Sequence, residues 1–172
     1  GYSLSGEVIA TGPGTSLKKG ARVYAGGSAD CGAFTKMWGG HIGHAIVAEA
    51  DAIVVPPSVS LAEASLTHLG GIAYHGYGLS KPKTDEKVAV IGLGILGQIS
   101  SRLHALSGAQ TVCCDVSAGR AAIAVKAGVK AMQVTGTLAQ SLMTIVPGGF
   151  DIIVDVTGAP AVIAQGLDLA KE

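Results

Sequence analysis

Charged residues are scarce in this 172-residue sequence. Asp, Glu, Lys and Arg make up 14% of it, with 12 basic side chains against 12 acidic ones, whereas soluble domains usually carry about 25%. The sequence therefore has no basic stripe or tail with which to bind nucleic acid or an anionic membrane surface. Together with a positive mean hydropathy, this composition indicates either a membrane-embedded chain or one rich in buried strands.

Long apolar runs are also missing. The longest, residues 88–97, contains three glycines and is too short to cross a bilayer, which takes about 20 residues. No charged segment followed by an apolar one opens the sequence, so no secretory signal is expected. We therefore interpret the hydropathy as buried parallel strands, which are covered on both faces and read as continuous apolar runs.

Cysteine is limited to Cys31, Cys113 and Cys114. An odd number without a regular spacing argues against a disulfide scaffold and is typical of a reducing cytoplasm. The absence of a C-x-x-C pair excludes a cysteine-based structural zinc site. Because Cys113 and Cys114 are adjacent in an expected strand, they should point to opposite faces as small core residues.

The first third of the sequence is rich in glycine and in short strand-like stretches. Gly, Pro or Asp residues separate the four stretches, which are residues 5–10, 21–24, 45–48 and 52–55. Several short strands with turn signals predict part of a β-barrel or sandwich over residues 1–58. A connecting helical segment follows over 59–80, where Ser60 and Glu63 predict a capping box and four glycines predict a broken or closely packed helix.

Residues 81–172 alternate between strand-like and helix-like segments. Strands are expected at Lys87–Ile91, 111–115, 131–134 and 150–156, and helices at Ile95–Leu106, 117–126, 137–145 and 160–170. This alternation predicts an α/β fold in which a doubly wound parallel sheet is covered by helices on both faces. We expect the strand order 3-2-1-4.

A G-x-G-x-x-G motif follows the first of these strands and opens the first helix. It consists of Gly92, Leu93, Gly94, Ile95, Leu96 and Gly97. In a Rossmann-type unit the first glycine allows a tight turn, the second lets the backbone approach a pyrophosphate, and the third lets helix and strand pack closely. The free N–H groups at the helix start would hold the anion. The motif thus predicts a dinucleotide site.

Asp115 ends the second strand 18 residues beyond Gly97, which matches the acidic residue that binds the adenosine ribose hydroxyls in Rossmann units. Its charge would repel a 2′-phosphate, which favours NAD over NADP. Arg120 leaves two interpretations open, since it could neutralise a phosphate or be an ordinary charge on a helix surface. Thr157 and Gly158 follow the fourth strand, either as ligand contacts at the sheet edge or as a helix-start turn.

Taken together, these features resemble the medium-chain dehydrogenase/reductase superfamily, the relatives of zinc alcohol dehydrogenases. The matching segments are residues 1–8, 11–12, 19–23, 54–56, 61–78 and 88–97, together with Asp115 and residues 155–158. The resemblance implies a GroES-like barrel domain followed by a Rossmann domain, homo-oligomers in many members, and NAD(H)-dependent hydride transfer to or from a small alcohol or carbonyl substrate. Members are longer, so the sequence looks like a fragment truncated at both ends.

The resemblance also bears on zinc. Zinc-dependent members have a His-Glu pair where this sequence has Tyr2 and Ser3, and a further ligand near His68. A catalytic zinc needs about three protein ligands, so zinc is not supported, and no metal ligands are assigned. His68, as an acid, and Tyr2, as a hydroxyl donor, remain the candidate catalytic groups.

The other histidines and the tryptophan are interpreted as structural. The spacing of His41 and His44 suggests a metal site. Rings three residues apart in a strand, however, point to opposite faces, which favours a loop or barrel-surface role. His75 and His104 fall in expected helices, and Trp38 is expected to anchor a loop.

The sequence therefore predicts the cofactor-binding part of an NAD(H)-dependent oxidoreductase that is inactive in the form given. The alternative is a dinucleotide-binding module without catalysis. A metal-storage protein has no ligand cluster to support it.

Overall fold

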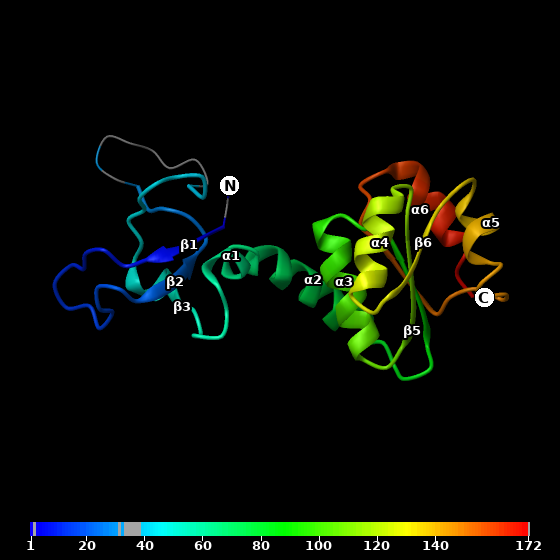
Figure 1. Ribbon diagram of the computed structural model, residues 1–172, viewed down its shortest axis with the longest axis horizontal. Helices are drawn as coiled ribbons and strands as arrows, with labels where there is room; N and C mark the ends of the chain where they lie inside the picture. Colours follow the sequence, from blue (N-terminus) through cyan, green and yellow to red (C-terminus); the bar gives the residue numbers. More distant parts are fainter. Residues whose placement is uncertain (2, 31, 33–38, 172) are drawn as a thin grey trace. The chain divides into compact units, whose positions relative to one another are not determined.

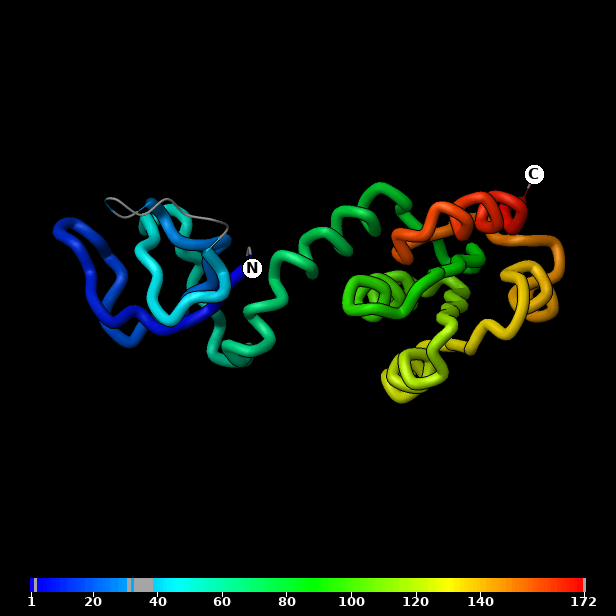
Figure 2. The backbone as a smooth tube through the Cα atoms, turned by 90° about the horizontal axis from the view of Figure 1, so that it is seen from above, coloured from blue at the N-terminus to red at the C-terminus, as the bar shows by residue number. Residues whose placement is uncertain are grey.

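The computed structural model describes residues 1, 3–30, 32 and 39–171, and the chain divides into two compact units, Gly1–Leu69 and Gly70–Glu172 (Figure 1). Figure 2 traces the backbone of each unit from a second direction. Each unit is taken by itself below. In the part of the chain that is described, no helix is both long and apolar enough to cross a membrane.

The first unit contains a three-stranded antiparallel sheet in the order β1 (Leu4–Glu7), β2 (Arg22–Ala25) and β3 (Ile53–Val54). The strand expected over residues 45–48 is wrong, because no strand forms there. The Ile46 carbonyl instead accepts a hydrogen bond from Ala29 N (2.7 Å), and Ile46 N donates to Ser28 Oγ (3.1 Å). A single 3₁₀ turn, η1 (Glu49–Asp51), follows.

The connecting segment forms two helices, α1 (Leu61–Ala64) and α2 (Thr67–Ser80). The expected capping box is confirmed: Ser60 Oγ accepts from Glu63 N, and the Glu63 carboxylate accepts from Ser60 N. The break falls at residues 65–66, ahead of the four glycines, which lie inside α2. A Cβ added at any of these glycines would meet nothing within 4 Å, so they neither break the helix nor mark a close contact.

The second unit is a four-stranded parallel sheet with helices packed along it. Its strands are β4 (Lys87–Ile91), β5 (Gln110–Asp115), β6 (Lys130–Gln133) and β7 (Ile152–Asp155), and its helices are α3 (Ile95–Leu106), α4 (Ala118–Lys126), α5 (Leu138–Leu142) and α6 (Pro160–Leu167). The spatial order β6-β5-β4-β7 confirms the expected order 3-2-1-4. α5 and β7 are shorter than expected: α5 ends at Leu142, and β7 begins at Ile152, after Gly148 and Gly149, which have positive φ.

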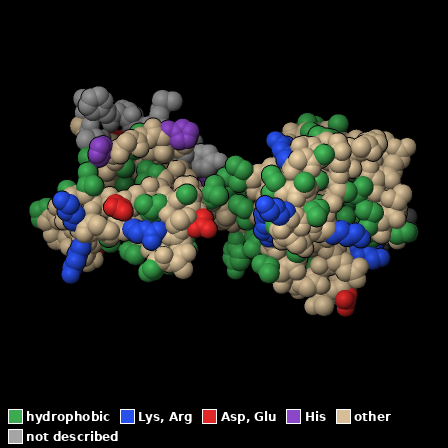
Figure 3. All heavy atoms as spheres, viewed as in Figure 1, with side chains coloured by type: hydrophobic (Ala, Val, Ile, Leu, Met, Phe, Trp, Pro, Cys, Tyr) green, Lys and Arg blue, Asp and Glu red, His purple; other side chains and the backbone are tan. Residues whose placement is uncertain are grey.

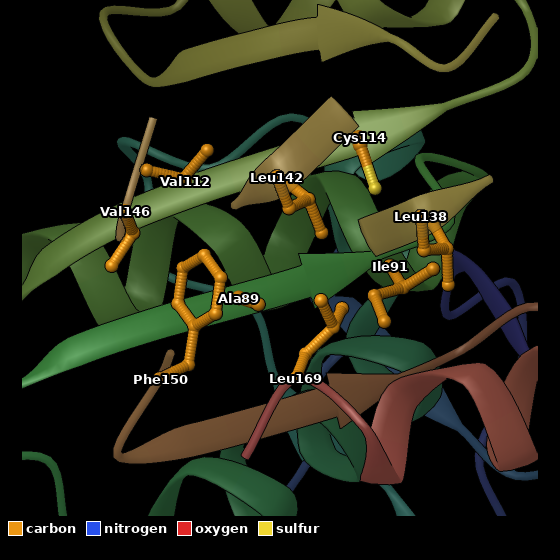
Figure 4. Packing of buried hydrophobic residues seen from close by; sticks show 9 residues of the cluster. All are labelled: Ala89, Ile91, Val112, Cys114, Leu138, Leu142, Val146, Phe150 and Leu169. Atoms are coloured by element: carbon orange, nitrogen blue, oxygen red, sulfur yellow. The ribbon is translucent and has the colours of Figure 1, made fainter. Parts of the chain in front are cut away.

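Two apolar clusters, one on each face of this sheet, form its core. One comprises Ala89, Ile91, Val112, Cys114, Leu138, Leu142, Val146, Phe150 and Leu169 (Figure 4). The other comprises Val88, Val90, Leu93, Ala109, Cys113, Ala121, Ala124 and Val129. Cys113 and Cys114 therefore do point to opposite faces. Burial raises the pKa of both thiols to about 12, so neither is a nucleophile near neutral pH.

His104 joins α3 to the end of α2 within the second unit. Its side chain is fully buried, with Nδ1 2.8 Å from the Ser100 carbonyl and Nε2 3.0 Å from Ser80 Oγ. The edge of its ring packs against Tyr77. These contacts confirm the structural interpretation of His104. His75, in α2, is exposed.

Candidate functional site

The glycine loop joins the end of β4 to the start of α3, and its three glycines differ in their surroundings. Gly92 has φ +94°, and a Cβ there would lie 2.9 Å from Thr157 Cγ2. At Gly97 a Cβ would lie 1.8 Å from the Gly92 carbonyl oxygen, a distance that no side chain tolerates. Gly94 is unlike both, because its Cβ would meet nothing within 4 Å. Gly92 thus allows the tight turn, Gly94 leaves the backbone open to a ligand, and Gly97 allows the helix to pack closely, as expected of the motif.

The start of α3 is suited to an anion. Gly94 is the N-cap residue and no side chain caps the helix. The first-turn N–H groups of an α-helix have no partner within the helix, and they carry the positive end of its dipole. The open face at Gly94 therefore leads to backbone donors, with no side chain of residue 94 in the way.

Asp115, at the end of β5, lies against this loop. Leu93 N donates to Asp115 Oδ2 (2.7 Å) and Ser117 N donates to Oδ1 (2.8 Å), while the residue is only 7% exposed. Burial raises the pKa of Asp115, but the hydrogen bonds from Leu93 and Ser117 and the Arg120 charge outweigh it, so that the pKa is lowered. The carboxylate is ionised at neutral pH. The expected convergence of Asp115 with the glycine loop is confirmed.

Arg120 lies in the first turns of α4 with its guanidinium exposed. Its Nη1 is 3.6 Å from Asp115 Oδ2. The sequence suggested either a phosphate partner or a plain surface charge, and in the structure the group pairs with the site's own carboxylate. The carboxylate that pairs with Arg120 is thus the group expected to bind ribose.

Thr157 and Gly158 form the turn that opens α6. Thr157 N and Oγ1 donate to Asp155 Oδ1 (2.9 and 2.8 Å), and Thr157 Oγ1 accepts from Ala159 N. Gly158 has φ +69°. The turn agrees with the helix-start interpretation, and the proximity of Thr157 to Gly92 puts it at the same sheet edge as the loop. Contact of Thr157 and Gly158 with the cofactor stays a prediction.

Sequence reasoning missed Gln98, which follows the third glycine. Its Nε2 donates to the Leu93 carbonyl (3.2 Å) and to the Arg120 carbonyl (2.9 Å). Its place directly after the motif was the available signal, but nothing in the spacing shows that the amide reaches α4.

The candidate catalytic groups, His68 and Tyr2, stay predictions. His68 is exposed, near the start of α2 and within the first unit, whereas Asp115 and the loop belong to the second. Tyr2, Cys31 and Trp38 lie outside the described residues.

His41 and His44 are exposed, as a barrel-surface role requires, and Figure 3 shows histidine side chains at the surface of the first unit. They line a hollow of about 890 Å³ together with Ser3, Ser5 and Glu7. Across the described ranges, no group of three or more His, Cys, Asp or Glu side chains could hold a metal ion.

No family model and no curated protein matches the sequence. Solved structures do match. 2R,3R-butanediol dehydrogenase from Bacillus subtilis shares 24% identity at a TM-score of 0.75, over 97% of this chain and 54% of that one. A short chain alcohol dehydrogenase from E. coli CFT073, complexed with NADH, shares 20% sequence identity at a TM-score of 0.77. The match covers 96% of this chain and 56% of that one.

A mycobacterial protein complexed with NADPH shares 21% identity at a TM-score of 0.79, over 99% of this chain and 53% of that one. The chain thus spans about half the length of the solved structures that it matches. These likenesses show that the chain has the fold these proteins share over the matched half, a small antiparallel sheet followed by a Rossmann-type sheet.

Proposed function

We propose that the chain binds NAD(H) at the glycine loop and Asp115, as the cofactor-holding part of an oxidoreductase for alcohols or carbonyl compounds. The observation that carries this proposal is the contact of Asp115 Oδ2 with Leu93 N inside the glycine turn. It joins the expected ribose ligand to the expected pyrophosphate site. Gly94, whose added Cβ would meet nothing, leaves the approach to that site open.

The residues present fit a dinucleotide. The start of α3 would bind the pyrophosphate through backbone N–H groups, and the Asp115 carboxylate would accept hydrogen bonds from the ribose hydroxyls. When bound, the nicotinamide supplies the hydride acceptor or donor. That solved structures of the same fold are complexed with NADH and with NADPH supports a nicotinamide cofactor.

We propose NAD rather than NADP because Asp115 is ionised and nearly buried. A 2′-phosphate would bring a second negative charge beside it. Arg120 already pairs with Asp115, so it would have to leave this carboxylate in order to neutralise the phosphate.

The substrate-side proposals rest on the resemblance. They comprise a small alcohol or carbonyl substrate and assembly into homo-oligomers. A cytoplasmic location is proposed separately, from three cysteines without a disulfide spacing. We further propose that the chain in the present form holds the cofactor without turning over substrate, since Tyr2 and Ser3 replace the His-Glu pair. The alternative is a dinucleotide-binding module without catalysis. Turnover of substrate by a longer parent protein would favour the oxidoreductase over this module.

A titration of the 172-residue chain with NADH, followed by nicotinamide fluorescence, tests the cofactor proposal. We expect saturable binding that Gly94→Val abolishes, because its side chain would cover the helix start. Gly78→Val, at an open position of α2, is the control and should bind as the unaltered chain does. If the unaltered chain binds neither NADH nor NADPH, the proposal fails.

A further inference from the structure

We propose that Gln98 positions the glycine loop and the first turn of α4 relative to each other, and that it thereby favours NADH over NADPH. This inference rests on the cofactor function proposed above. Gln98 is a positioning residue in this proposal, acting through the two backbone segments that it connects.

The amide of Gln98 connects the glycine loop directly with α4. Nε2 donates to the carbonyl of Leu93, in the loop, and to the carbonyl of Arg120, in α4. The first segment would bind pyrophosphate, and the second carries the guanidinium that faces Asp115. One NH₂ group thus sets the separation between the expected pyrophosphate site and Arg120.

A second glutamine shows what Gln98 adds. Gln133 Nε2 donates to the carbonyl of Val116 (3.0 Å) and so braces the turn after β5 from the side of β6. It does not reach the glycine loop. Gln133 and the hydrogen bonds of Asp115 therefore hold the turn after β5 in place. Gln98 links the glycine loop to α4.

The energetics of the Gln98 amide favour a geometric role over a stabilising one. Among the described residues its Oε1 is buried and has no hydrogen-bond partner. A buried acceptor without a partner costs free energy of the same order as the hydrogen bonds that the NH₂ group gains. An apolar side chain of similar length would lose two bonds and also remove the unpaired oxygen. We therefore expect little change in stability when the amide is replaced.

The two cofactors would respond differently to a shift of α4. NADH would depend on hydrogen bonds between Asp115 and ribose hydroxyls, which weaken steeply with distance and angle. NADPH would depend more on attraction between the 2′-phosphate and Arg120, which falls off only as the inverse of distance and which a long side chain can follow. A looser α4 should therefore weaken NADH more than NADPH.

Gln98→Met tests this in the full 172-residue chain, with Gln165→Met as the matched control. Gln165 also links two elements, since its Oε1 in α6 accepts from Leu138 N in α5, and neither element contains the loop, Asp115 or Arg120. For Gln98→Met we expect the Kd of NADH to rise by about fivefold or more and that of NADPH by less than about twofold, with a Tm shift within about 2 °C. Gln165→Met should change neither Kd.

A measurement without cofactor complements the titrations. Amide hydrogen exchange in the first turn of α4 and at Leu93 should be faster in Gln98→Met than in the unaltered chain and in Gln165→Met. Should Gln98→Met not fold, Gln98→Leu removes the donors without adding a charge, and it should show the same selective loss of NADH.

Three results would overturn the inference: equal weakening of both cofactors, unchanged binding of both, or a fall in Tm that accounts for the loss. Failure of the unaltered chain to bind NADH would reject the proposed function, and this inference with it. Normal binding by the unaltered chain with no selective effect of Gln98→Met would reject the inference alone.

Discussion

At the scale of single residues, the three glycines of the motif are needed for different reasons. At Gly92 and Gly97 a side chain would clash with the protein itself, whereas at Gly94 it would obstruct the expected ligand. Gly97→Ala would force a methyl group to within 1.8 Å of the Gly92 carbonyl oxygen. Because backbone cannot move aside cheaply, we expect a loss of about 1–3 kcal/mol or more in the free energy of unfolding. Urea denaturation measures it.

The matched variant is Gly94→Ala. Its methyl group meets nothing, and φ −64° suits any residue, so stability should change little while the NADH Kd rises, since the methyl lies on the approach to the helix start. Equal stability of the two variants would contradict this division of roles.

Asp115 allows a second prediction at this scale. Replacing it with Ser removes the charge that disfavours a 2′-phosphate and releases Arg120 from its pair. We expect the NADH-to-NADPH preference to narrow or reverse, by about tenfold, or roughly 1.4 kcal/mol. Parallel fluorescence titrations with both cofactors give the ratio. Asp115→Asn, which keeps the shape, separates charge from packing, and an unchanged ratio in both variants would show that Asp115 does not set the preference.

At the scale of elements, Asp151 joins three segments at the start of β7. Its Oδ1 accepts from Lys171 Nζ (2.6 Å) and its Oδ2 from Lys87 N (2.8 Å), while Lys171 N donates to the Phe150 carbonyl. The hydrogen bond from Lys171, followed by that from Lys87 N, lowers the pKa of Asp151 from its usual 3.8. The contribution of this carboxylate to stability is therefore complete above the unfolded pKa and is lost as the pH falls through the lower, folded pKa.

Acidification to about pH 3 and below should accordingly loosen the segment after α6. The amide of Lys171 should lose protection from hydrogen exchange, relative to its intrinsic rate, before amides of β4 do. Asp151→Asn should show reduced protection already at neutral pH, with little further change on acidification. A Lys171 amide that is equally protected at both pH values in the unaltered chain would contradict this assignment.

The elements also show how far the sequence could predict the structure. The order of the parallel sheet and the bounds of Ile95–Leu106 were predictable because alternating apolar runs and the glycine motif are local signals. The strand over residues 45–48 was not, because strand formation depends on a partner, and Ile46 bonds to Ala29 and Ser28 instead. The role of Gln98 was likewise hidden, since it depends on α4 lying beside α3 in the folded unit.

At the scale of the whole chain, the groups expected to bind cofactor and those expected to act on substrate are divided between the two units. The glycine loop, Asp115, Arg120 and Thr157 belong to the second unit, and His68 belongs to the first. The chain can therefore bind cofactor even if it lacks some of the groups that hydride transfer to or from a substrate requires.

We expect the 172-residue chain to bind NADH without catalysing oxidation of simple alcohols or reduction of simple aldehydes, and to hold no zinc. A catalytic zinc requires about three protein ligands and an open position, and the positions that the resemblance assigns to a His-Glu pair hold Tyr2 and Ser3. His68 would be a single ligand, which cannot retain zinc against water and buffer. Without the metal, polarisation of a carbonyl group would fall to His68 or to the Tyr2 hydroxyl.

Elemental analysis of protein purified without chelator tests the zinc half of this prediction. One zinc per chain, lost in His68→Ala, would show it to be wrong. The catalytic half is tested by following NADH absorbance with a panel of alcohols and aldehydes. Steady turnover would contradict the prediction. Its loss in His68→Ala or Tyr2→Phe would then show that the substituted group is required, because the two variants remove the acid and the hydroxyl donor while leaving the glycine loop and Asp115 intact. Binding of NADH without turnover is the expected result.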